Sequence, residues 1–349
     1  MEHQKTILTL ILFSLLLCGV VVGGSKTDLR KDLISFLRKA GLDEELDAAV
    51  SVSMDNSGNV RILDEGTFFM QYMVMEPQKS ADADIVIDPN VTIPASCNKL
   101  VIVTHGWIDK FDGDWSADTA RQIAKKVDPN EWVCGSFDWH RGALVVNPVD
   151  AAKYGRDVAG PRLANAVLKL PMELEHLHMV GHSAGSWTIN TAAKILAKKT
   201  KAQIHLTFLD AYVPPGWEEK ELGKIASNEN VWAEHYYTRD LTLKATQTNL
   251  SAAHNVDITS IDTWFKEHEF PYRWYYATVA GKYRNVDSER DEKVITRYKQ
   301  IDYGFTRSRE AGNENWKQSL KLKKGNSAVE LKKPKSKSWF DSPASKKQR

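Results

Sequence analysis

Apolar residues in the middle of the chain gather in short continuous runs, and longer stretches with helical spacing lie between the runs. Apolar runs of about four to eight residues are typical of strands buried in a parallel sheet, whereas apolar residues that recur every three or four positions are typical of helices. Strand patterns lie at residues 66–75, 99–104, 131–137, 176–180, 202–209 and 231–237, and helical patterns at 158–170 and 187–196. This alternation predicts an α/β fold, with a mostly parallel central sheet and helices on both faces.

The first 24 residues have the pattern of a secretory signal peptide. Lys5 precedes an apolar run at 7–22, and small residues follow at 23–25. We therefore expect residues 1–24 to be removed and the protein to be secreted or extracytoplasmic. An uncleaved anchor is an alternative. Lipoprotein anchoring through Cys18 is a weaker one, because the residue before it is larger than the small residue that such processing prefers.

Charge divides the chain into an acidic body and a basic C-terminal tail. The whole chain carries a net charge of +2, but residues 306–349 carry +9 and residues 1–305 carry −7. Because the tail has few apolar residues and no periodicity, we expect 306–349 to be disordered. Such a tail is either simply solvated or attached to an anionic membrane or polysaccharide surface. Residues 25–305 then form one domain, which begins with an amphipathic helical segment at 25–51, and no nucleic-acid partner is expected.

The pattern Gly-His-Ser-Ala-Gly at 181–185 stands between a predicted strand and a predicted helix. In that context G-x-S-x-G is typical of a nucleophile elbow, a tight turn that exposes a serine hydroxyl above the N-terminus of the helix. Gly181 and Gly185 must then lack a Cβ, which would strike the neighbouring strand or helix. Ser183 is the predicted nucleophile.

A serine hydroxyl needs a base to take its proton and an acid to orient that base. In enzymes with a nucleophile elbow of this kind, the acid precedes the histidine in the chain. His205 and His235 lie inside predicted strands and are expected to be packed, which leaves His254 and His268 as candidate bases. Two aspartates, at 210 and 240, follow predicted strands and compete as the acid.

Five motifs together resemble the pancreatic lipase family of secreted lipases and phospholipases A1, over about residues 68–276. They are V-T-H-G-W-I-D-K at 103–110, F-D-W-H-R-G-A at 137–143, G-H-S-A-G-S at 181–186, T-F-L-D-A at 207–211 and H-E-F-P-Y-R-W-Y-Y at 268–276. The resemblance implies the α/β-hydrolase fold and a catalytic triad of Ser183, Asp210 and His268.

The same resemblance implies an oxyanion hole made by the backbone N–H groups of Trp107 and Ala184. Gly106 would let that loop approach the substrate, and two donors aimed at an oxyanion typically stabilise the transition state by several kcal/mol. His105 is expected to fix the loop by hydrogen bonding rather than to act as a base. This chemistry requires no cofactor, and neither a cofactor nor a metal is expected.

The chain departs from the family in three ways. No cysteine follows Cys134 to clamp a lid, only 57 residues separate Asp210 from His268, and the basic tail replaces the lipid-binding β-sandwich of vertebrate members. Cys97 and Cys134 alone make no disulfide framework. We therefore predict a serine hydrolase that cleaves carboxylic esters of lipids, of lipase, esterase or phospholipase A1 type, with an open site. The alternative is a catalytically silent lipase-like protein that binds lipid or a surface.

Overall fold

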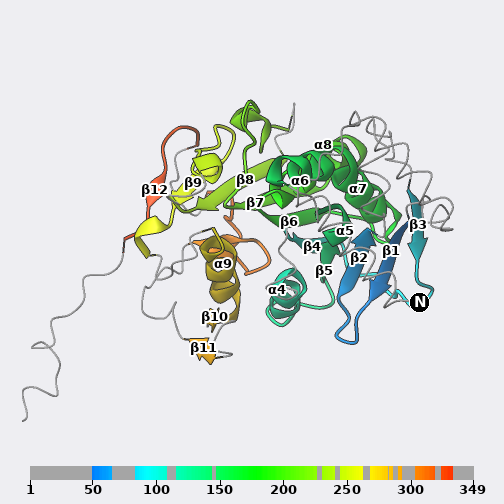
Figure 1. The fold of residues 1–349 in the computed structure, drawn as a ribbon. Coiled ribbons are helices and arrows are strands. Elements are labelled where there is room, and N and C mark those ends of the chain that lie inside the picture. Colours follow the sequence, from blue (N-terminus) through cyan, green and yellow to red (C-terminus); the bar gives the residue numbers. More distant parts are fainter. Residues whose placement is uncertain are drawn as a thin grey trace, which may run out of the picture.

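The computed structural model describes residues 49–64, 83–107, 115–143, 147–225, 230–239, 244–261, 268–281, 283–285, 290–292, 303–318 and 324–332 (Figure 1). The predicted signal peptide with Cys18, nearly all of the predicted N-terminal helical segment and the strand pattern at 66–75 lie outside these residues. The described part of that helical segment is not helical, because residues 49–54 form a strand. No helix among the described residues is long and apolar enough to cross a membrane.

Ten strands of the described chain form one sheet in the order β12-β9-β8-β7-β6-β4-β5-β2-β1-β3. The strands are β1 Ala49–Met54, β2 Val60–Asp64, β3 Asp84–Ile87, β4 Lys99–Thr104, β5 Trp132–Asp138, β6 His176–His182, β7 Gln203–Leu209, β8 Val231–Tyr237, β9 His254–Asp257 and β12 Val329–Glu330. Neighbours are parallel except for the β1–β2 pair, which is antiparallel. The prediction of a mostly parallel sheet is confirmed.

Helices cover both faces of this sheet, as predicted (Figure 1). One layer holds α6 Pro148–Tyr154, a π-helical turn at Gly155–Ala159, α7 Gly160–Lys169 and α8 Gly185–Lys199, and the other holds α4 Trp115–Ala124 and α9 Phe270–Ala280. Short helices also lie at His140–Ala143 (α5), Glu219–Glu221, Lys244–Thr246, Thr259–Ile261 and Gly304–Arg307, and β10 Tyr283–Asn285 pairs with β11 Arg290–Glu292. The sheet therefore has a separate apolar core on each side.

The prediction of one disordered tail from 306 to 349 is wrong for residues 306–318 and 324–332. The first of these stretches is buried against the sheet at Arg307, Ser308, Glu310 and Trp316, and β12 adds to the sheet edge by pairing in parallel with β9. The stretch at 303–318, which we call the C-terminal strap, has few apolar side chains because it packs largely through buried polar groups.

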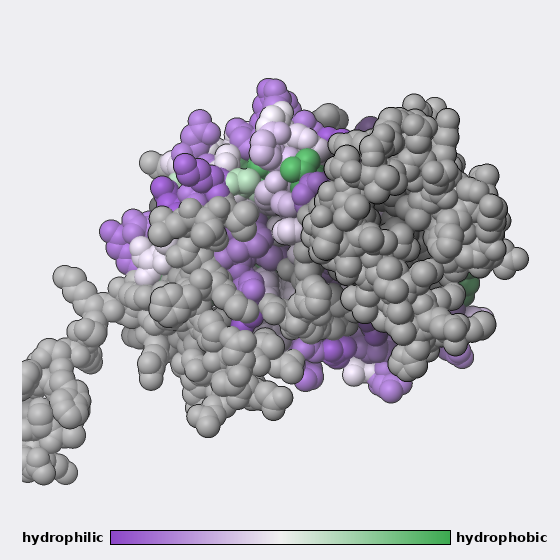
Figure 2. Space-filling model, in the orientation of Figure 1, coloured by the Kyte–Doolittle hydropathy of each residue, from purple (hydrophilic) through white to green (hydrophobic). Residues whose placement is uncertain are grey.

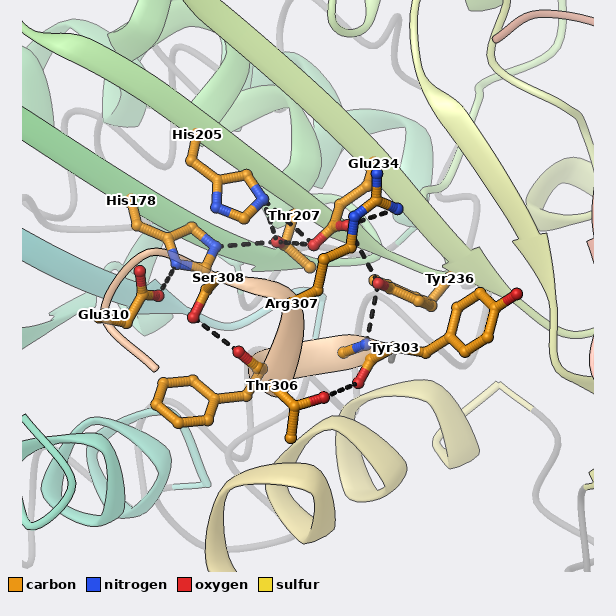
Figure 3. Close-up of polar contacts among 12 residues, drawn as sticks. His178, His205, Thr207, Glu234, Tyr236, Tyr303, Thr306, Arg307, Ser308 and Glu310 are labelled. Atoms are coloured by element: carbon orange, nitrogen blue, oxygen red, sulfur yellow. Dashed lines mark hydrogen bonds and ion pairs between the residues drawn. The ribbon is translucent and has the colours of Figure 1, made fainter. Parts of the chain in front are cut away.

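The strap covers a polar area on the sheet. Parallel strands buried on both faces are usually apolar throughout, yet β6, β7 and β8 present fully buried His176, His178, His205, Thr207 and Glu234 to this side. Figure 3 shows the strap residues Arg307 and Glu310 reaching these strands. The charged strap residues Arg307 and Glu310 are therefore partners of the sheet rather than solvated groups.

Candidate active site

The elbow has the predicted geometry. Ser183 lies between β6 and α8 with a φ of 52°, a left-handed conformation that is strained for a residue with a side chain. A Cβ on Gly181 would lie 2.8 Å from the carbonyl oxygen of Gly185, and a Cβ on Gly185 would lie 2.2 Å from that of His105. Both glycines are required because strand, helix and the loop after β4 meet here at backbone distance.

Three side chains from distant parts of the chain form a hydrogen-bonded relay. His268 Nδ1 lies 2.5 Å from Asp210 Oδ2, and His268 Nε2 lies 3.0 Å from Ser183 Oγ. Because a carboxylate only accepts, Nδ1–H donates to Asp210 and Nε2 is left to accept the Ser183 hydroxyl proton. The structure therefore brings together the three residues that the sequence analysis selected, in the arrangement that activates a serine.

Asp210 is held firmly in its position. It is fully buried and has a φ of 46°. Its second carboxylate oxygen, Oδ1, accepts the Thr238 N–H at 2.9 Å, and the next N–H, that of Ala211, donates to His235 Nε2 at 3.1 Å. Burial lowers the pKa of His235 to about 4, so this ring stays neutral and keeps the lone pair that accepts the bond.

The other sequence candidates take different places. Asp240, the rival acid, lies outside the described residues. His254 begins β9 at the amino end of the strand and stacks on Trp232 with ring centroids 4.2 Å apart, whereas Ser183 and Asp210 lie beyond the carboxyl ends of β6 and β7. His254, the other candidate base, is therefore not brought to Ser183, which contacts His268 instead. His205 and His235 are fully buried inside strands, as predicted.

The loop after β4 lies against the elbow. His105 Nδ1–H donates to the Gly106 carbonyl at 2.9 Å, Nε2 accepts the Trp139 N–H at 3.0 Å, and the ring stacks on Trp139 with centroids 5.2 Å apart. His105 therefore fixes the loop, as expected. Trp107 comes two residues after the carbonyl that touches Gly185, and Ala184 directly follows Ser183. The two backbone groups expected to bind an oxyanion thus lie on the two chain segments that meet at the elbow.

The sequence analysis missed His182. Its Nε2–H donates to the His268 carbonyl at 3.0 Å, and its ring lies 4.7 Å from the His268 ring and 4.8 Å from the Tyr272 ring. This side chain is fully buried, so it ties the segment that carries His268 to the end of β6. Its place next to the nucleophile was the available signal.

The residues that could hold a metal lie elsewhere. Within the described ranges, one group of metal-ligating side chains is clustered: His178, His205 and Glu310, on the sheet face under the C-terminal strap. None of the three contacts Ser183 or His268, so the relay and this cluster are separate sites.

No protein-family model matches the chain, and no curated protein matches it. The assignment of a function therefore rests on the geometry of the relay and on the sequence motifs.

Proposed function

We propose that this protein is a secreted serine hydrolase of the α/β-hydrolase fold that cleaves carboxylic esters of lipids. The observation that carries the proposal is the Ser183–His268–Asp210 relay at a strained strand-to-helix elbow on a parallel sheet. An isolated serine in a loop would need neither the strained φ nor the two glycines without room for a Cβ.

The contacts support a two-step reaction. Ser183 Oγ attacks the ester carbonyl while its proton passes to His268 Nε2, and Asp210 stabilises the resulting imidazolium. His268 then gives that proton to the leaving alcohol, and an acyl-enzyme remains. Water, deprotonated by the same nitrogen, releases the acid. In both steps the N–H groups of Ala184 and Trp107 would stabilise the tetrahedral oxyanion.

The chain between Asp210 and His268 supports an open site. Its described residues, 211–225, 230–239 and 244–261, supply β8, β9 and short turns that pack into the body. A lipase with a large lid gains activity sharply when substrate forms an interface, because the opened lid exposes apolar surface. We therefore expect turnover of dissolved short-chain esters without a jump at the solubility limit.

The test uses a fluorophosphonate probe and a series of p-nitrophenyl esters of increasing chain length, with a phospholipid and a triglyceride beside them. Wild-type protein should be labelled at Ser183 and should hydrolyse the esters, whereas Ser183→Ala should do neither. Ser186→Ala is the matched control, because this buried serine lies in the first turn of α8, just after the elbow, and contacts the Gly181 carbonyl rather than His268. Full activity in Ser183→Ala would exclude Ser183 as the nucleophile and the relay as the catalytic site. Absence of both labelling and turnover in the wild type would favour the silent, surface-binding alternative.

A further inference from the structure

A second cluster of reactive side chains lies under the C-terminal strap, apart from the relay. His178 projects from β6, His205 from β7 and Glu310 from the strap (Figure 3). One ligand atom from each lies within 4.8 Å of those of the other two, and all three residues are buried. Two imidazoles and a carboxylate converge here from segments that are 132 residues apart.

The hydrogen bonds around the cluster determine where its protons lie. Glu234 Oε1 accepts both the Thr207 hydroxyl at 2.9 Å and a ring nitrogen of His205, Nε2, at 3.1 Å. Because Thr207 has donated its proton, its oxygen must accept at 2.8 Å from His178 Nε2–H. Both imidazoles therefore carry their proton on Nε2.

In the neutral form of each ring, Nδ1 is then a bare lone pair. His205 Nδ1 has no hydrogen-bond partner among the described residues, and His178 Nδ1 faces a carboxylate oxygen of Glu310 in close contact. A lone pair opposite a carboxylate is repulsive unless a cation lies between them. The second oxygen of Glu310 also has no hydrogen-bond partner. Two buried electron-pair donors, His205 Nδ1 and the second oxygen of Glu310, thus lack a partner among the described residues, and His178 Nδ1 needs a proton or a metal ion to face Glu310.

Formal charge leads to the same conclusion. The buried carboxylates Glu234 and Glu310 face one buried guanidinium, that of Arg307, whose Nη1 lies 3.6 Å from Glu234 Oε2. An uncompensated charge in a protein interior is strongly destabilising. One more positive charge is therefore needed among these groups, on the side of Glu310.

We propose that His178, His205 and Glu310 bind one divalent transition-metal ion of the zinc class. Two imidazoles and a carboxylate are ligands that such an ion prefers. The bonds from the His205 and His178 rings to Glu234 and Thr207 are of the kind that orients metal-binding histidines. The two rings now stack with centroids 3.8 Å apart and planes 10° apart, so binding would tilt one ring out of the stack.

The ion would join the strap to the middle of the sheet, so its role is structural. No metal was expected from the sequence, because the predicted hydrolase chemistry needs none and because no local motif joins His178, His205 and Glu310. It is also independent of ester hydrolysis, since none of its ligands contacts the relay.

The test measures zinc directly. Full-length protein is stripped with a chelator, gel-filtered and titrated with Zn²⁺ by calorimetry, and Co²⁺ is added separately to record its visible absorption. We expect one equivalent of zinc, a cobalt spectrum with imidazole ligands and a melting temperature several degrees higher with zinc than without. His205→Gln and Glu310→Gln should lose the stoichiometric binding.

His176→Gln is the matched control. His176 lies two residues before His178 on the same face of β6, is equally buried, and has no hydrogen-bond partner on either ring nitrogen, but it is not part of the ligand group. This variant should keep one zinc. The metal site is refuted if wild-type protein binds no stoichiometric zinc and melts at the same temperature with and without it. In that case a proton shared between His178 and Glu310 supplies the missing charge. This result is decisive even if the variants fail to fold, because it needs only the wild type.

Discussion

Two truncations of the C-terminus should behave in opposite ways. Removing residues 306–349 takes away Trp316 and Arg307, whereas removing 333–349 leaves every described residue in place. A buried tryptophan covers about 150–250 Å², which corresponds to about 4–6 kcal/mol of stability. The same truncation removes Arg307 and uncovers Glu234, so the polar side of the sheet would be exposed to water. The tryptophan contribution alone is comparable to the lower end of the free energy of unfolding of a typical domain, about 5–15 kcal/mol.

We therefore expect the longer truncation to yield protein that is unfolded or aggregated. The shorter one should keep the wild-type midpoint in urea, followed by tryptophan fluorescence, and full esterase activity. Binding to anionic vesicles, measured by sedimentation at increasing salt, should be lost in the shorter truncation if residues 333–349 are the attachment segment. A 1–305 fragment that unfolds at the same urea concentration as the full chain would refute the structural role of the strap.

Two further predictions concern the site and its support. Asp210→Asn should lower kcat by about 10⁴-fold because it removes the carboxylate that orients His268, while Asp240→Asn stays near wild type in the same assay; the reverse result would move the acid to position 240. The pKa of His235 is about 4 in the folded protein, whereas the same imidazole in the unfolded chain has the ordinary pKa of about 6.5. The stability that His235 contributes is therefore complete above pH 6.5 and is lost as the pH falls toward 4, because the unfolded chain takes up a proton first. The urea midpoint of the wild type should fall over that interval, and the midpoint of His235→Gln should fall less steeply; equal slopes would contradict the neutral ring.

Strands buried in the centre of the sheet could be predicted closely from the sequence. The strands Lys99–Thr104 and Val231–Tyr237 have the predicted limits. A short continuous apolar run is typical of a strand buried in a parallel sheet, so its ends mark the ends of the strand. The elbow and its partners at 210 and 268 were also found, because tight turns and proton relays require particular residue types at particular points.

Other parts of the fold depend on contacts that no local pattern reveals. Asp84–Ile87 was not among the predicted strands, yet it pairs with β1. Val329–Glu330 is a strand only because it pairs with β9. Arg307 and Glu310 resemble the solvated charges around them in sequence, and their burial follows from polar residues on strands made more than 70 residues earlier. The alternation of His176 and His178 with apolar residues on a central strand was the one signal of a polar face.

The distance along the chain between His178 and Glu310 has a consequence for how the protein reaches its native state. Chains are synthesised from the N-terminus, and pairings between remote segments form slowly because a long loop must close first. The face of β6, β7 and β8 can be closed only after residues 303–318 have left the ribosome. Until then the imidazoles and the carboxylate on this face stay hydrated, so the face does not promote aggregation. Docking of residues 303–318 should therefore be the final, rate-limiting event of folding, and it follows assembly of the elbow.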